Sequence, residues 1–304
     1  MKILITGGNG FVGRYVSTEL KKFDHKVYSP NHNQMDCSNP LSVDKTLEKI
    51  NPELIIHTAA FIMPTDKMKN NHKNIFEKNK NLNSNILKAA SKKNIKNILC
   101  FGSHTMYSND SKKNEKNILE NNPPSFIEGY ANSKRLLFKE CQKYCTLGLN
   151  YKMLVLPSIY GPFDLKSPPK QMLNSVILRA LESKKNNKRY LEIYGDLSAL
   201  REYIFLPDLT DWIIKKVNFI DSLPVALNLG TNSLLSVLEY YKICSKLINI
   251  ELKLDNESVK LIKDELGEFP LDCSLAQNFG WENFTSIEEG IIQTIRHIEG
   301  HYGI

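Results

Sequence analysis

Three glycines near the amino terminus have the type and spacing that suit binding of a phosphate group. Gly7, Gly10 and Gly13 stand at the spacing GxxGxxG, between a short apolar run and a segment with helical periodicity. Gly7 permits a sharp exit from a strand. Gly10 lets backbone N–H groups approach a pyrophosphate at a helix N-terminus, and Gly13 lets that helix lie close to the strand. The spacing predicts a dinucleotide-binding turn; a tight turn without a ligand is the alternative.

A tyrosine and a lysine provide the second chemical signal. Tyr130 and Lys134 lie one turn apart on a helix predicted from Gly129, so that their side chains share a face. YxxxK is a weak motif, since roughly 1.5 matches are expected by chance in this composition. Its position gives it weight, because the helix follows a strand that ends at Ser103, on the side of the sheet where a dinucleotide would lie. A surface pair is the alternative.

Short apolar runs alternate with helical patterns through the first half of the chain. The strands are expected at 3–5, 25–29, 54–60, 98–101 and 151–156, and the helices at 11–20, 41–50, 75–90 and from 129. This alternation predicts an α/β fold with a doubly wound parallel sheet, the Rossmann fold, over residues 1–162. Residues 163–304 are expected to form mainly a smaller C-terminal α/β substrate-binding domain, with 201–232 returning to the first domain.

The end of the second strand bears on the choice of cofactor. NAD-binding units of this kind place an acid there to accept hydrogen bonds from the ribose 2′-OH. The chain has Ser29, Pro30, Asn31 and His32 instead, which favours NADP(H) over NADH, with Arg14 or Lys26 within reach of the phosphate. Asp36 is read either as a contact to the adenine or as an acid that leads the next helix.

Composition limits the other classes of partner. The net charge of +7 comes almost entirely from lysines, which stand with asparagines in surface-like stretches such as 67–80 and 112–116. No cluster of basic and aromatic residues predicts a nucleic-acid site, although the charge can help to collect an anionic substrate. The six cysteines are dispersed without a CxxC, so we expect reduced, mostly buried thiols and no metal site. We expect a cytoplasmic protein without a signal peptide or membrane span.

Several motifs together resemble the extended short-chain dehydrogenase/reductase family. They are the turn GGNGFVG, Ser103 with Tyr130-x-x-x-Lys134, Tyr160-Gly161-Pro162, and Arg201-Glu202-Tyr203. The most similar branch is the GDP-fucose synthase type, which reduces nucleotide-linked 4-keto sugars. The similarity runs nearly end to end.

The resemblance implies a role for each matching residue. Tyr130 would protonate the sugar carbonyl oxygen as hydride arrives, Lys134 would lower the pKa of Tyr130 and hold the nicotinamide ribose, and Ser103 would bond the same oxygen. Arg201 would pair with the substrate diphosphate. The residues expected at the cofactor are Gly7, Gly10, Phe11, Val12, Gly13, Arg14, Asp36, Ala59, Ala60, Asn79, Tyr130, Lys134, Pro157 and Ile159. Those expected at the substrate are Ser103, His104, Thr105, Met172 and Arg201.

Departures from the family pattern bear on the reaction. Dehydratases of the family carry an acidic pair at the positions of His104 and Thr105, so dehydration is not expected here. The GDP-fucose synthase branch carries a Cys at Thr105 and a His at Met172, which epimerise the carbons beside the ketone. A threonine hydroxyl and a thioether cannot exchange protons with a carbon acid at neutral pH. Ketone reduction without epimerisation is therefore expected, with His104 as a possible substitute base.

The expected function is an NADPH-dependent C4 reductase of a GDP-linked 4-keto-6-deoxy sugar, acting in surface-polysaccharide synthesis. Two alternatives stay open: a nucleotide-sugar 4-epimerase with tightly held NAD, whose active-site stretch also reads Ser-x-Thr-x-Tyr, and a catalytically silent regulatory relative. Relatives are commonly dimers through the Tyr130 helix, so a homodimer is expected, with Leu136, Leu137 and Cys141 as candidate contacts or core residues.

Overall fold

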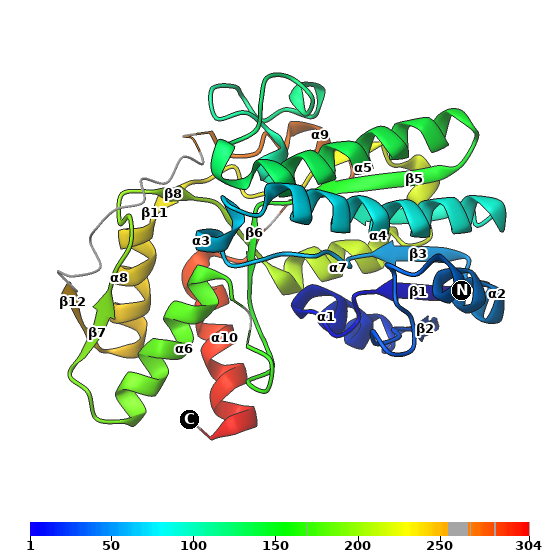
Figure 1. Cartoon of the computed structure of the whole chain (residues 1–304). Coiled ribbons are helices and arrows are strands. Elements are labelled where there is room, and N and C mark those ends of the chain that lie inside the picture. The colour runs from blue at the N-terminus through cyan, green and yellow to red at the C-terminus, as the bar shows by residue number, and fades with distance from the viewer. Residues whose placement is uncertain (169, 255–266, 268, 283, 304) are drawn as a thin grey trace.

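A parallel sheet of six strands forms the centre of the first half of the molecule (Figure 1). The computed structural model describes residues 1–168, 170–254, 267, 269–282 and 284–303. The strand order is β10-β5-β4-β3-β1-β2, and every neighbouring pair in it is parallel. The chain leaves β1 toward β2 and then crosses back to β3 on the other side, which makes the ends of β1 and β3 the switch point where such sheets bind ligands.

The strands and helices have the following residue ranges. The strands of the main sheet are β1 Lys2–Thr6, β2 Lys26–Tyr28, β3 Leu54–His57, β4 Asn97–Phe101, β5 Asn150–Val155 and β10 Ala226–Asn228. The shorter strands are β6 Ser158–Tyr160, β7 Tyr190–Ile193, β8 Leu200–Arg201, β9 Tyr203–Phe205, β11 Leu235–Ser236 and β12 Glu251–Leu254. The α-helices are α1 Phe11–Leu20, α2 Pro40–Ile50, α3 Thr65–Met68, α4 His72–Lys92, α5 Glu128–Thr146, α6 Met172–Lys185, α7 Leu206–Lys216, α8 Val237–Ile248, α9 Ser274–Gln277 and α10 Ile287–Tyr302.

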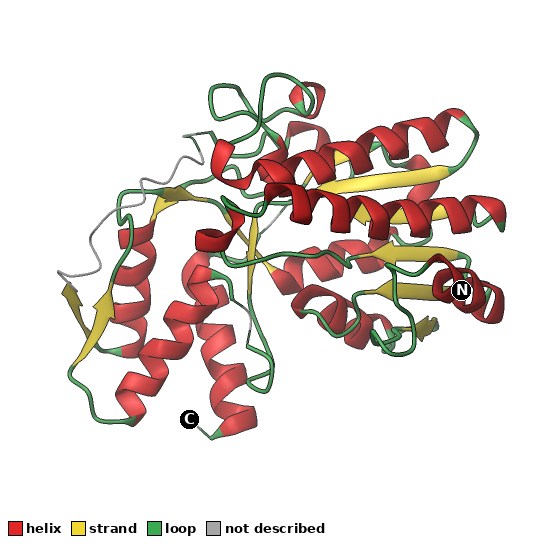
Figure 2. Cartoon of the chain, in the orientation of Figure 1, coloured by secondary structure: helices red, strands yellow, loops and turns green. Residues whose placement is uncertain are grey.

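Two groups of helices flank the sheet (Figure 2). Helix α4 packs against α2 and lies side by side with α5, while α1 packs against α7. The strands between them are buried, as the run Ile3, Leu4 and Ile5 in β1 shows, with each side chain fully inaccessible. Strands covered on both faces are continuously apolar, which is why these segments could be recognised from the sequence.

A second apolar core lies beside the first. It joins α6, α8 and α10 to the parallel pair of β7 and β12, and it includes Leu173, Ile177, Tyr241 and Ile291. Figure 1 shows these helices as a group at the end of the molecule away from β2. Tyr203 and Phe205 of β9 belong to this core, whereas Ile204 and the apolar face of α7 belong to the core of the main sheet.

The predicted fold class is confirmed, with corrections in detail. The third strand ends at His57 rather than at residue 60. Residues 158–160 form β6, which pairs in parallel with β9, so residues 203–205 of the segment expected to return to the first domain join this small sheet and not the main one. The region expected to form the smaller α/β domain contains α8 and β12, while residues 255–266, 268, 283 and 304 lie outside the described residues.

Some burial expectations also change. The thiols are free, and all but the half-buried Cys145 are buried, as predicted. Leu137 and Cys141 are buried inside the chain, which leaves only Leu136 of the proposed contact residues partly exposed. The homodimer itself stays a prediction. The reading of 112–116 as a surface stretch is wrong for Lys113, whose exposure is 4%.

Within the described part of the chain, no helix has the length and apolar character needed to cross a membrane.

Two helical glycines offer a matched test of the close packing at the glycine-rich turn. A Cβ on Gly13 of α1 would lie 2.4 Å from the Gly7 carbonyl oxygen and 2.7 Å from Thr58 Oγ1, whereas a Cβ on Gly300 of α10 meets nothing within 4 Å. Gly13→Ala should lower the free energy of unfolding by about 1–3 kcal/mol through overpacking. Gly300→Ala should raise it by about 0.5 kcal/mol through helix propensity. Urea unfolding measures both, and equal effects would contradict the packing described.

Candidate active site

The glycine-rich turn is packed tightly on the protein side. Added Cβ atoms would lie 2.9 Å from the Ala59 backbone at Gly7 and 2.6 Å from Ser29 Cβ at Gly8. Gly7 also has a φ of +70°, which L side chains rarely adopt. The turn therefore runs directly over the ends of β2 and β3, as the sequence predicts.

The N-terminus of α1 fits an anionic ligand. Gly10 is the N-cap, and no side chain accepts a hydrogen bond from the first turn of the helix. A Cβ on Gly10 would meet only the Gly7 carbonyl oxygen, at 3.1 Å. Backbone N–H groups at the start of a helix, together with its dipole, bind phosphate when no side chain caps them. Phe11, Val12 and Gly13 are thus placed to hold a dinucleotide diphosphate.

A buried histidine connects the loops that follow β1 and β3. His57 Nδ1 lies 2.7 Å from Thr6 Oγ1, and its Nε2 lies 3.0 Å from Asn83 Oδ1 on α4. Thr58 Oγ1 donates to the Thr6 carbonyl at 2.7 Å. Burial lowers the pKa of His57 to about 4, so the imidazole is neutral at pH 7. This network fixes the edge on which Ala59 is half-buried and Ala60 exposed.

Ser103 lies just beyond the end of β4. The Gly102 and His104 N–H groups donate to the Leu154 and Leu156 carbonyls at 2.7 and 2.8 Å, so this segment continues to follow β5 toward Pro157. Ser103 Oγ accepts hydrogen bonds from Thr105 N at 3.3 Å and from Thr105 Oγ1 at 3.0 Å. The Ser103 hydroxyl can still donate its own proton to a ligand oxygen.

Helix α5 brings Lys134 to the same strand end. Lys134 Nζ donates to the Phe101 carbonyl at 2.7 Å and lies 5.6 Å from the centre of the Tyr130 ring. Arg135 Nε donates to the Met106 carbonyl at 2.6 Å and fixes the next segment. Tyr130, Lys134 and Ser103 are therefore gathered at the carboxyl end of β4.

The protonation states differ from the expectation in one respect. Burial raises the pKa of Tyr130 to about 12, whereas the resemblance led us to expect a lowered pKa. Burial also lowers the pKa of Lys134 to about 8. Desolvation is the main cause of both shifts, since Lys134 is buried and Tyr130 half-buried. At neutral pH the tyrosine holds its proton, which is the state that a general acid needs.

His104 follows Ser103 and lies close enough to Arg201 for the two side chains to interact electrostatically. Burial and the positive charges of Lys113 and Arg201 hold the pKa of His104 well below its usual value, so its imidazole is neutral. Arg201 is half-buried at the end of β8, and its Nη1 donates to the Leu200 carbonyl at 2.7 Å. Met172 is the first residue of α6, where it is partly buried against the second core, and Ile159 lies in β6 opposite Ile204.

Two predicted cofactor residues are used by the protein itself. Arg14 Nη1 pairs with Asp164 Oδ2 at 2.5 Å, and its Nη2 donates to the Asn9 carbonyl, so both terminal nitrogens have protein partners and its contact with the cofactor stays a prediction. The pair lines a cavity of about 500 Å³ between α1, the loop after β6 and α10. Asn79 is fully buried and bonds both the N–H and the carbonyl of Phe61, at 2.9 and 2.8 Å, which positions the loop after Ala60.

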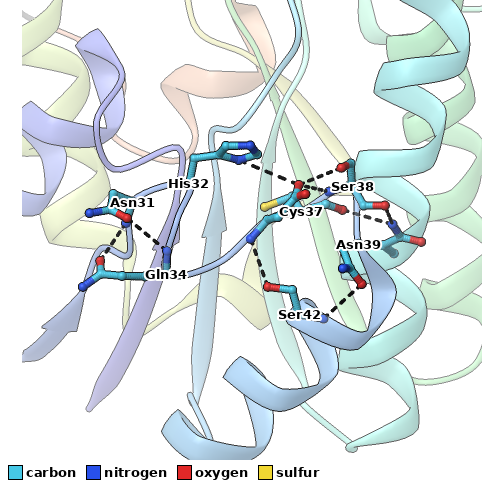
Figure 3. A network of polar contacts seen from close by, with 9 residues as sticks. Asn31, His32, Gln34, Cys37, Ser38, Asn39 and Ser42 are labelled. Atoms are coloured by element: carbon cyan, nitrogen blue, oxygen red, sulfur yellow. Dashed lines mark hydrogen bonds and ion pairs between the residues drawn. The ribbon is translucent and has the colours of Figure 1, made fainter.

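Asp36 closes a local turn before α2. Figure 3 shows His32, Ser38 and Ser42 in the network of polar contacts of this segment. Asp36 Oδ1 accepts from Ser38 N at 2.8 Å and from Ser38 Oγ at 2.7 Å, and it lies 3.8 Å from His32 Nδ1. These hydrogen bonds lower the pKa of Asp36. The carboxylate thus has a structural use, and its contact with the adenine stays a prediction.

The comparisons with known proteins agree with this geometry. The model of the NAD dependent epimerase/dehydratase family matches residues 3–230. The chain belongs to this family.

Curated relatives extend the match to nearly the whole chain. GDP-L-colitose synthase of Yersinia pseudotuberculosis is 28% identical over 302 residues, which cover 98% of this chain and 97% of that protein. GDP-L-fucose synthase of Azorhizobium caulinodans is 25% identical and covers 97% and 96%. The GDP-mannoheptose C4 reductase MlghC from Campylobacter jejuni, solved with NADP bound, superposes with a TM-score of 0.83 at 22% identity and covers 98% of each chain.

Family membership confirms the predicted enzyme class, an NAD(P)-dependent oxidoreductase of the extended short-chain dehydrogenase/reductase type. Sequence reasoning did not find His57, Lys113 or Glu202, which shape the site of this family member. His57 follows a strand as any core residue would, and Lys113 stands among many lysines, so neither carried a signal. The Arg-Glu-Tyr motif indicated Arg201 but carried no signal for the buried carboxylate of Glu202 beside it.

The buried histidine predicts a specific dependence of stability on pH. Because the pKa of His57 is lowered on folding, the unfolded chain binds more protons between pH 6.5 and about 4. The free energy of unfolding should therefore fall as pH drops through this range, by up to about 1.4 kcal/mol per pH unit from this group. His57→Gln should be less stable at pH 7 but flatter in its pH profile, measured by urea unfolding at pH 7 and pH 5. The exposed-histidine control His32→Gln should keep the wild-type slope; an unchanged slope in His57→Gln would refute the assignment.

The expected role of Tyr130 as the proton donor can be tested by comparing two tyrosine variants of helix α5. Tyr130→Phe should reduce kcat by about 10²–10⁴-fold, because it removes the hydroxyl that we expect to protonate the substrate oxygen. Its Kd for the dinucleotide should stay within a few-fold of wild type. Tyr144→Phe, a change of another tyrosine on α5, is the control and should keep full activity. Steady-state kinetics and dinucleotide titration measure these effects, and normal turnover by Tyr130→Phe would remove the residue from the mechanism.

Proposed function

We propose that the protein is an NADPH-dependent reductase that converts the C4 ketone of a GDP-linked 4-keto-6-deoxy sugar to an alcohol, without epimerising the neighbouring carbons. The observation that carries the proposal is the convergence of Ser103, Tyr130 and Lys134 at the end of β4. The near full-length similarity to GDP-L-colitose and GDP-L-fucose synthases supports the substrate class.

NADPH, held at the N-terminus of α1, supplies the hydride in this proposal. The absence of an acid in the first residues after β2 favours the phosphorylated dinucleotide, and the Campylobacter jejuni heptose reductase of the same fold was solved with NADP bound. In this proposal the dinucleotide lies along the strand ends, beside the glycine turn and the exposed Ala60.

The side chains would handle the proton and the developing charge. Ser103, whose Oγ already accepts from Thr105, donates a hydrogen bond to the ketone oxygen and so orients the carbonyl while keeping its own proton. Tyr130, protonated at neutral pH, gives its proton to that oxygen as the carbon is reduced. Lys134 places a positive charge near the resulting tyrosinate and stabilises it. Arg201 binds the diphosphate of the substrate in this arrangement.

The lack of epimerisation rests on the residues around the ketone. Thr105 is 5% exposed and bonds Ser103, and Met172 offers a thioether, so neither can remove a proton from carbon. His104 is neutral, but its strongly lowered pKa makes it a weak base. These features support reduction as the whole reaction.

The proposal is tested by mixing the purified protein with a freshly generated GDP-4-keto-6-deoxy sugar and NADPH in deuterated water. Loss of nicotinamide absorbance equal to the product formed, with no solvent deuterium on carbon in the product mass, is the expected result. Deuterium on the carbons beside C4 would show that epimerisation is retained. No loss of NADPH, with NAD released on denaturing the protein as isolated, would instead support a 4-epimerase. Cofactor binding without any turnover would support the silent regulatory alternative.

A further inference from the structure

Thr105 bonds Ser103 through both its backbone and its side chain. Its N–H donates to Ser103 Oγ at 3.3 Å, and its own Oγ1 lies 3.0 Å from the same oxygen. Thr105 is 5% exposed, whereas Ser103 is half-buried. The threonine hydroxyl is therefore withdrawn from solvent, and the bond that it makes goes to Ser103. An effect of Thr105 on a ligand would pass through the serine.

Ser103 caps a short helical turn, and two other elements hold this turn in place. Met106 N donates to the Ser103 carbonyl at 2.9 Å, and Ser103 N donates to Met106 Sδ at 3.5 Å. The Met106 carbonyl accepts from Arg135 Nε at 2.6 Å, which ties the turn to α5. His104 N donates at 2.8 Å to the carbonyl of Leu156, the residue after β5. The turn is therefore formed before a ligand binds.

The hydrogen bonds to Ser103 Oγ determine what this hydroxyl can offer to a ligand. A hydroxyl has one proton to donate and two lone pairs that accept. The backbone N–H of Thr105 has a fixed direction and occupies one lone pair. The two hydroxyls share the other bond, and either of them can donate it. When a ketone oxygen takes the proton of Ser103, only Thr105 can donate in that bond. Both lone pairs are then in use, and Ser103 meets the ligand as a donor alone.

A serine that can only donate suits a ketone substrate. The ketone oxygen accepts hydrogen bonds and has no proton to give. Without the Thr105 hydroxyl, Ser103 could turn its proton away and present a lone pair, which repels that oxygen. Hydrogen bonds in a chain also polarise one another, so the bond from Thr105 strengthens the bond that Ser103 donates. This benefit is greatest as negative charge develops on the ketone oxygen, which is the condition for an effect on kcat.

We propose that Thr105 is a positioning residue, which donates to Ser103 and so fixes the serine hydroxyl as a hydrogen-bond donor to the reacting oxygen of the substrate. The proposal rests on the proposed function and adds a residue to it. Thr105 exchanges no proton with the substrate and keeps its own throughout. The sequence placed Thr105 among the substrate residues, and in this proposal it acts on the substrate through Ser103.

Three replacements of Thr105 test this role in the full-length protein, by steady-state kinetics with a GDP-4-keto-6-deoxy sugar and NADPH. Thr105→Val keeps the shape but loses the hydroxyl, and it should lower kcat by about 3–10-fold, the range for one neutral hydrogen bond. Thr105→Ser keeps a hydroxyl and should stay within about twofold of wild type. Thr105→Cys has a weak donor and should lie between them. It serves as the loss variant if the valine variant does not fold.

Two controls accompany these variants. The Kd for NADPH should stay within about twofold of wild type in each, because the change is made at the substrate side of the reaction. Thr294→Val makes the same change at a fully buried threonine of α10, whose Oγ1 donates to the Gly290 carbonyl at 2.7 Å. This variant should keep the kcat of wild type.

A double-mutant cycle with Ser103→Ala separates positioning from structural support. Ser103→Ala should by itself lower kcat by about 10²–10³-fold, as for the loss of one donor to a developing oxyanion. In that background Thr105→Val should lower kcat by less than about a further twofold, because Thr105 has no serine hydroxyl left to orient. A threonine that only supported the turn would lower kcat by the same factor in both backgrounds.

The outcomes distinguish this proposal from the proposed function. Wild-type kcat in Thr105→Val overturns the positioning role, and so do equal losses in the two backgrounds of the cycle. A protein that epimerises a nucleotide sugar and reduces no ketone, yet gives the same cycle for that turnover, supports the positioning role and rejects the reductase. A wild-type protein that turns over neither kind of sugar overturns both proposals.

Discussion

The hydrogen bond from Lys134 Nζ to the Phe101 carbonyl is the contact on which the rest of the site depends. A buried ammonium needs an acceptor, and the carbonyl at the end of β4 supplies one. The bond fixes the rotation of α5 and thereby the place of Tyr130, one turn earlier on the same face. Ser103 follows Phe101 by two residues, so the same strand end positions the hydroxyl that would orient the ketone.

The protonation states of the side chains beyond the end of β4 are consistent with a site that donates protons and does not accept them. Tyr130 is protonated at neutral pH because burial raises its pKa to about 12, and His104 is neutral and weakly basic because burial and two cations lower its pKa. Thr105 and Ser103 are hydroxyls bonded to one another. The oxygen of a ketone placed here would meet hydrogen-bond donors. The negative charge that develops on this oxygen during reduction would then be neutralised by a proton from one of them.

The sequence predicted the features that depend on local pattern. Continuous apolar runs such as Ile3–Ile5 marked buried parallel strands, and the spacing of Gly7, Gly10 and Gly13 marked the turn. It could not predict contacts between distant segments, such as Arg14 with Asp164 or β6 with β9, because no local pattern encodes them. The direction of the Tyr130 pKa shift was wrong because burial is a property of the whole fold.

The central claim is that a ketone binds beside Ser103, Tyr130 and Lys134 and is reduced there by direct hydride transfer. The most direct test uses NADPH carrying deuterium at the transferable position of the nicotinamide, in ordinary water, with nuclear magnetic resonance of the sugar product. The account predicts one deuterium on C4, the carbon that bears the new hydroxyl, and none elsewhere. Product without deuterium at C4, formed while the labelled NADPH is left unchanged, would contradict it.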